Sequence, residues 1–158
     1  MPDTSSLATI ADYFRLGLET GLLKPDDAKA WALSVVERLP EPPYEIIELS
    51  WIEGLASTLE ALATIKGERD TKLAGQWILG CLRESMPQSD EHLHWMARRA
   101  MQIAKTAGLG DETYYKFDSI DDALSLARSK TCGTVEECRN GLLDALEEYP
   151  MPPSFSAS

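Results

Sequence analysis

The two histidines of the chain, His92 and His94, are the first candidates for a metal site or for acid–base chemistry. Residues two apart on a helix point about 200° away from each other, so the two imidazoles cannot hold one metal ion together. His94 could form a weak site with Asp90 and Glu91, but a solvated helix start explains these charges better. We therefore expect no bound metal and no cofactor.

The three cysteines, Cys81, Cys132 and Cys138, are the candidates for a nucleophile or a disulfide. Three cysteines cannot all pair within one chain and none forms a Cys-x-x-Cys motif, so we expect reduced thiols. The sequence contains no glycine-rich phosphate loop, nucleophile elbow or His-Glu-x-x-His motif. A cysteine paired with a histidine, or Glu48 as a general acid or base, is the enzymatic alternative. We predict that the protein is not an enzyme.

Acidic side chains are concentrated between residues 41 and 60, where the sequence has no lysine or arginine. Glu41, Glu45 and Glu48 follow one another at spacings of four and three residues, so on a helix their carboxylates form a ridge. Like charges this close repel each other, so stability alone gives no reason for the ridge. A basic partner would remove that repulsion, and an aromatic side chain would add apolar contact area. The predicted binding surface comprises Glu41, Tyr44, Glu45, Glu48 and Glu53.

Glu48 is unusual, because helical spacing places it inside the apolar sector of its segment. A carboxylate in that position must be paired, protonated or at the edge of the buried surface. One interpretation is a side chain that bends to water or meets an arginine of a neighbouring helix. The functional interpretations are a general acid or base, or a contact for a basic partner.

Trp95 and Arg99 form a second candidate surface, because Trp95 lies about 160° from the apolar side of its helix, beside Arg99. Tryptophan and arginine are enriched among the residues that dominate binding energy at interfaces. The alternative is that another helix of the bundle covers this side.

The elements that would position these residues are helices. Apolar residues recur at helical spacing, and no stretch shows the sustained alternation of a strand. Prolines and glycines separate the helical segments, and Thr134 with Glu137 forms a capping box for the last one. We expect an irregular stretch over Gly110–Asp118 and seven helices, over residues 4–20, 25–39, 43–65, 70–86, 90–108, 119–129 and 134–149.

The segment Pro43–Ile65 is predicted to be a central helix against which the others pack. A capping box at Ser50–Glu53 is the alternative, since a break at Ser50 would give two short helices. We favour one helix and an all-α, single-domain bundle of about seven helices, with Trp31, Trp51 and Trp77 buried. The residues expected on the buried face of the central helix are Tyr44, Ile47, Trp51, Leu55, Thr58, Leu59 and Leu62.

The length of 158 residues suits one domain, over residues 1–149, with a frayed proline- and serine-rich tail over 150–158.

The net charge of −11 disfavours a nucleic-acid ligand, because phosphate backbones attract clustered lysine and arginine. The sequence has no run of about 18 apolar residues, and its first residues lack the features of a signal peptide. We therefore expect a cytoplasmic protein that does not enter a membrane.

The stretch Gly21–Trp51, with Leu22-Leu23, Asp27-Ala28, Trp31 and Pro42-Pro43-Tyr44-Glu45, resembles segments of uncharacterised bacterial proteins. As a small, acidic, all-helical chain without a catalytic motif, the protein also resembles, as a class, the immunity proteins that bacteria make against secreted polymorphic toxins. This resemblance implies tight binding and occlusion of a basic toxin domain. We predict an immunity- or antitoxin-like inhibitor that is monomeric or weakly dimeric. The alternative is a helical adaptor or regulatory module of a larger bacterial assembly.

Overall fold

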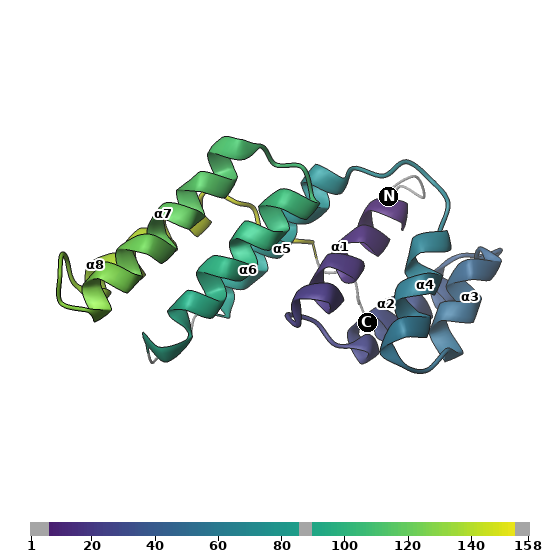
Figure 1. Ribbon diagram of the computed structural model, residues 1–158. Helices are drawn as coiled ribbons and strands as arrows, with labels where there is room; N and C mark the ends of the chain where they lie inside the picture. The colour runs from purple at the N-terminus through teal and green to yellow at the C-terminus, as the bar shows by residue number, and fades with distance from the viewer. Residues whose placement is uncertain (1–6, 86–89, 154–158) are drawn as a thin grey trace. The chain divides into compact units, whose positions relative to one another are not determined.

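The computed structural model describes residues 7–85 and 90–153, and this part of the chain is all-α, as predicted (Figure 1). The described ranges contain eight α-helices and no strand. The chain divides into two compact units, and the division falls within one helix: unit 1 is Met1–Ala74 with Pro152–Ser158, and unit 2 is Gly75–Met151. The single domain expected from the chain length stays a prediction. Nowhere in the described ranges does a helix combine the length and apolar character that crossing a membrane requires.

Unit 1 is built from four helices and the first turn of a fifth: α1 (Leu7–Thr20), α2 (Pro25–Arg38), α3 (Tyr44–Trp51), α4 (Leu55–Thr64) and α5 (Thr71–Glu84). α1 packs against α2 and α4, and α3 packs against α2 and α4. In the core, the rings of Phe14 and Trp31 stack with centroids 5.3 Å apart, and Trp31 is fully buried as predicted. The core of unit 1 also contains fully buried aliphatic side chains, among them Leu16, Val35, Ile46, Leu49 and Leu62.

The predicted central helix over Pro43–Ile65 is wrong, because the segment forms two helices. α3 ends at Trp51 and α4 begins at Leu55, and between them Gly54 adopts a φ of +94°. Glycine reaches this backbone conformation without the steric cost that a side chain imposes, so the chain turns there and not at Ser50. The continuous apolar stripe drawn through both helices therefore does not exist, and the helices pack against each other instead.

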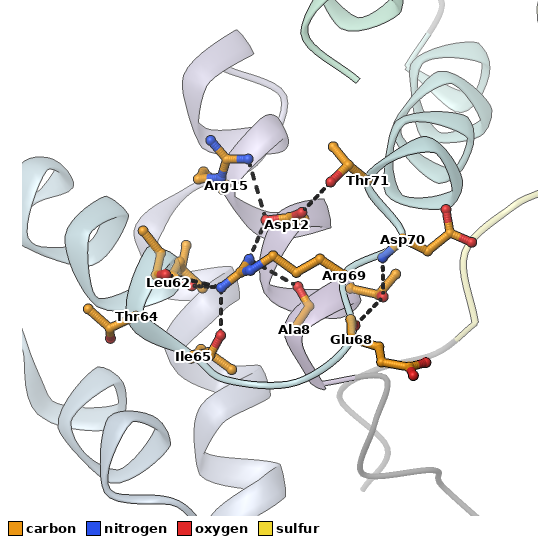
Figure 2. Close-up of polar contacts among 12 residues, drawn as sticks. Ala8, Asp12, Arg15, Leu62, Thr64, Ile65, Glu68, Arg69, Asp70 and Thr71 are labelled. Carbon is orange, nitrogen blue, oxygen red and sulfur yellow. Dashed lines mark hydrogen bonds and ion pairs between the residues drawn. The ribbon is translucent and has the colours of Figure 1, made fainter. Parts of the chain in front are cut away.

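A buried polar network fastens the segment between α4 and α5 to α1 (Figure 2). The carboxylate of Asp12, which is 1% exposed, accepts hydrogen bonds from the Arg69 guanidinium and from the Thr71 hydroxyl at 2.9 Å. Arg69 also donates to main-chain oxygens at the end of α4, including that of Ile65 at 2.6 Å. The last carbonyls of a helix have no partner within the helix, so Arg69 caps α4 while Asp12 balances its charge.

Unit 2 contains the rest of α5, a short 3-10 helix η2 (Asp90–His92), and α6 (Leu93–Thr106), α7 (Asp111–Arg128) and α8 (Val135–Glu147). α6 packs against α7, and α7 packs against α8. A Cβ added at Gly75 would overlap the side chain of Ala107, so glycine permits the close approach of α5 to the end of α6. Trp77 is buried, as predicted. The Thr134 hydroxyl accepts a hydrogen bond from the Glu137 main-chain N–H at 3.1 Å, which confirms the predicted N-cap of α8.

The stretch Gly110–Asp118, predicted to be irregular, is helical from Asp111 onwards. Gly110, with a φ of +101°, precedes the helix, and Asp111 and Glu112 in the first turn complement the positive end of its dipole. Phe117 is fully buried, seven residues before the buried Leu124. α7 therefore begins about two turns before the helix start predicted at residue 119.

Candidate functional site

α3 presents an apolar and aromatic face to the solvent. Tyr44 and Trp51 are 67% and 63% exposed, and Ile47 between them is 37% exposed. At 100° per residue these three side chains lie within about 60° of one another around the helix. We call Tyr44, Ile47 and Trp51 the α3 face. The predicted burial of Trp51 is wrong.

The opposite side of α3 explains this exposure. Ile46 and Leu49 are fully buried and lie roughly half a turn away from Trp51. α3 thus has two apolar sides, and only the aliphatic one packs against α2 and α4. Tyr44, Ile47 and Trp51 therefore contribute little to the core of unit 1, which α3 joins through its aliphatic side.

Carboxylates lie on and beside α3, but the predicted ridge of three along one helix is wrong, because only Glu45 and Glu48 are on α3. Glu45 and Glu48 are half-buried on α3, whereas Glu41 precedes the helix and Glu53 follows it, both exposed. In the ranges that the structure describes, none of these four carboxylates forms an ion pair. Glu48 therefore stands at the edge of an exposed apolar face, not inside the core, and no arginine of a neighbouring helix neutralises it.

The α3 face is comparable in size to the largest apolar patch of a typical monomeric protein. A large aromatic side chain can cover roughly 150–250 Å², so the exposed parts of Tyr44, Ile47 and Trp51 together amount to on the order of 300 Å². Leu55, at the start of α4, is a further exposed apolar side chain. Apolar patches of this size on monomeric proteins are frequently binding sites.

Trp95 and Arg99, the second predicted surface, lie on α6 in unit 2 and so on a separate element from α3. The Arg99 guanidinium carbon stands 5.2 Å from the centre of the Trp95 ring, and Arg99 donates to the Gln102 side chain at 3.0 Å. Trp95 is 37% exposed, and it lines a hollow of about 390 Å³ with Ser85, His92 and Met96. Neighbouring helices therefore cover Trp95 only in part, and the stacked arginine holds its ring in place.

The polar residues near the start of α6 are engaged with one another. The Asp121 carboxylate on α7 pairs with His94 and accepts a hydrogen bond from Arg98 at 3.4 Å. The Asp90 carboxylate pairs with Arg139 at 2.9 Å. Within the described residues no three His, Cys, Asp or Glu side chains are grouped to hold a metal ion. These pairs tie α6 and η2 to α7 and α8.

A groove of about 360 Å³ runs between α7 and α8, lined by Ile120, Leu126 and other small or apolar side chains. It also contains Cys132, which is exposed, and Cys138, which is 9% exposed. Burial, with a smaller contribution from Glu137, raises the pKa of the Cys138 thiol above its ordinary value. A raised pKa keeps the thiol protonated at neutral pH and lowers its reactivity as a nucleophile.

Lys116 on α7 forms the clearest surface ion pair of unit 2, with its ammonium 2.7 Å from the Glu148 carboxylate. That hydrogen bond raises the pKa of Lys116, while partial burial acts in the opposite direction. Its ammonium also lies 6.0 Å from the centre of the Tyr149 ring. The pair connects α7 with the end of α8, which indicates a structural role.

The sequence thus identified the residues of the α3 face and its border but assigned the face to the core. The signal that could have corrected this is Ile46 and Leu49, a second apolar pair on the other side of the same short helix. Two ion pairs, Asp12 with Arg69 and His94 with Asp121, join residues that are far apart in the chain. No local sequence pattern predicts either pair. Comparison with protein-family models, with curated proteins and with solved structures found no match to this chain.

Proposed function

We propose that this protein is a non-enzymatic, cytoplasmic inhibitor of the immunity or antitoxin type, which binds a basic toxin domain through the α3 face. The observation that supports this proposal is the exposure of Tyr44 and Trp51 on a helix whose neighbouring carboxylates form no ion pair within residues 7–85 and 90–153. The polar networks around Asp12, Asp121 and Asp90 are paired internally and connect neighbouring helices. A protein whose prominent surface feature is a contact face acts by binding.

The two components of the α3 face have different roles in such binding. The glutamates attract a basic domain over distances up to about the Debye length, roughly 8–10 Å at physiological salt, and so accelerate encounter. Tyr44 and Trp51 lose water in the complex and provide the area from which most interface free energy comes. Contact with lysine or arginine would also relieve the repulsion between Glu45 and Glu48.

The test of this proposal uses a variant in which Glu41, Glu45 and Glu48 are changed to Gln. Affinity capture from the native host, with the wild-type chain as bait, supplies the partner. The variant should remain folded, because Glu45 and Glu48 repel each other on α3 and none of the three carboxylates forms an ion pair in the described structure. Its association with the captured partner should be slowed several-fold at low salt and by less at high salt.

A matched variant carries the same loss of charge elsewhere, and its three positions, Glu84, Asp122 and Asp144, are exposed in unit 2. It should bind the partner at the wild-type rate. Equal association rates for the two triple variants would show that Glu41, Glu45 and Glu48 form only a solvated surface.

Inhibition separates an immunity protein from a passive adaptor. Expression of the captured partner alone should arrest the growth of a host cell, and co-expression of the wild-type chain should restore it. The variant Trp51→Ala should restore growth less well, because it removes the largest side chain of the α3 face. A partner that is harmless when expressed alone would favour the adaptor alternative.

A further inference from the structure

We propose that the α3 face receives a single amphipathic helix of the partner, apolar along one side and carrying lysine or arginine along one edge of that side. This inference rests on the proposed function, in which α3 binds a basic protein, and it specifies which kind of element makes the contact. Three features of α3 support it: the spacing of its exposed residues, the state of its main chain and the side on which its charges lie.

The exposed residues follow the spacing of a helix–helix seam. Tyr44, Ile47 and Trp51 are separated by three and four residues, which is the spacing of the a and d positions of a coiled coil. With a rise of 1.5 Å per residue, the stripe extends over about 10 Å and is one side chain wide. A helix laid along such a stripe inserts its own apolar residues between those of α3.

The main chain of α3 offers an extended partner no continuous row of free groups. The N–H groups of Ile46 and Ile47 donate to the oxygen of Pro43, and that of Ile52 donates to the oxygen of Glu48, so only groups in the first and last turns lack a partner within the helix. An extended segment laid across the aromatic rings would bury its own N–H and C=O groups without partners, which is unfavourable. A helix satisfies these groups internally and can be buried on one side at no such cost.

The charges on α3 lie on one edge of the face. Around the helix, Glu48 is about 40° and Glu45 about 100° from Tyr44, in the same direction, whereas Ile47 lies on the other side. The partner helix therefore carries its basic residues along the matching edge. A second copy of this chain is the wrong occupant, because it would bring the same carboxylates to the same seam.

The experiment uses a synthetic peptide of about three heptads, with leucine at a and d, lysine at e, and alanine and glutamine elsewhere. One control peptide has the same composition with its leucines spread around the helix, and another replaces each lysine with glutamate. Binding is measured by isothermal titration, and helix formation by the circular dichroism of the mixture compared with the sum of its components.

The leucine-striped lysine peptide should bind the wild-type chain and gain helicity on binding. The glutamate peptide should not bind, and the spread-leucine peptide should bind at least about tenfold more weakly, as expected when an aromatic anchor loses its apolar contact. Trp51→Ala should weaken the first interaction by a similar factor, and the double change of Glu45 and Glu48 to Gln should weaken it several-fold. The double change of Asp122 and Asp144 to Asn, in unit 2, should leave it unchanged.

Equal binding of the striped and spread peptides, or binding that Trp51→Ala does not weaken, would overturn the helix assignment. So would a wild-type dimer in sedimentation that Trp51→Ala dissociates, since a second copy would then occupy the face. If the captured basic partner depends on Trp51 while the striped peptide does not bind, the helix inference fails and the proposed function stands. If neither depends on Trp51, both fail.

Discussion

The buried carboxylate of Asp12 provides the sharpest test of how unit 1 is held together. The perturbation is Asp12→Ala, which removes the acceptor of Arg69, Thr71 and Arg15 and leaves the Arg69 guanidinium with main-chain oxygens alone. The side chain of Asp12 is 1% exposed and that of Arg69 is 28% exposed, so the pair is sheltered but not sealed from water.

The magnitude follows from this burial. Removing one partner of a fully buried ion pair costs about 3–5 kcal/mol, because the remaining charge is stranded. Arg69 is partly exposed and keeps its bonds to the end of α4, so part of that cost is screened. We expect Asp12→Ala to lower the free energy of unfolding by about 2–3 kcal/mol, out of about 5–15 kcal/mol for a typical domain.

The matched control lies on the same helix. Arg15 and Glu19 form a half-exposed pair at 3.6 Å with the spacing of one helical turn, and such pairs contribute about 0.3–0.5 kcal/mol. Glu19→Gln should therefore change the free energy of unfolding by no more than about 0.5 kcal/mol. Urea titration followed by far-ultraviolet circular dichroism and by tryptophan fluorescence measures both variants.

A double-mutant cycle of Asp12→Ala with Arg69→Met isolates the pairwise term. The losses of unfolding free energy in the two single variants should add up to much more than the loss in the double variant, because each single change removes the same interaction. If Asp12→Ala destabilises no more than Glu19→Gln, the network is not what fastens the segment after α4 to α1, and the reasoning fails.

Four further predictions concern other parts of the structure. Trp31→Ala should lower the free energy of unfolding by about 3–5 kcal/mol, whereas Trp51→Ala should change it by less than about 1 kcal/mol, as chemical denaturation can measure; equal losses would place Trp51 in the core. Gly75→Leu should destabilise unit 2 by at least about 1–3 kcal/mol, because its side chain overlaps α6, and an unchanged melting temperature would contradict the close approach. Because burial raises the pKa of Cys138, the folded state holds its proton more tightly than the unfolded state. The free energy of unfolding should therefore fall as pH rises above about 8.5, and a Cys138→Ala variant should show a smaller fall. At pH 8, a thiol reagent should label the exposed Cys132 faster than Cys138, which mass spectrometry of the labelled peptides would show.

Local patterns in the sequence were sufficient to predict the class of the fold and most helix positions. Apolar spacing indicated helices, and the capping of α8 by Thr134 followed from one hydroxyl three residues before a glutamate. The positions of Glu45 and Glu48 on one side of a helix were also predicted correctly, since they depend only on residue types and helical geometry. These features are determined within a few turns of the chain, which is why they needed no tertiary information.

Which side of α3 is buried was decided only by the tertiary structure. Both sides are apolar, and Ile46 and Leu49 are inside because α2 and α4 are there to cover them. The break at Gly54 makes this possible, because the buried side of α3 then no longer has to be in line with the buried side of α4. Likewise, Asp12 meets Arg69, 57 residues away, only after α1 and α4 have packed. Whether a residue is buried depends on which other elements pack against it, and helical spacing within one segment contains no information about those elements.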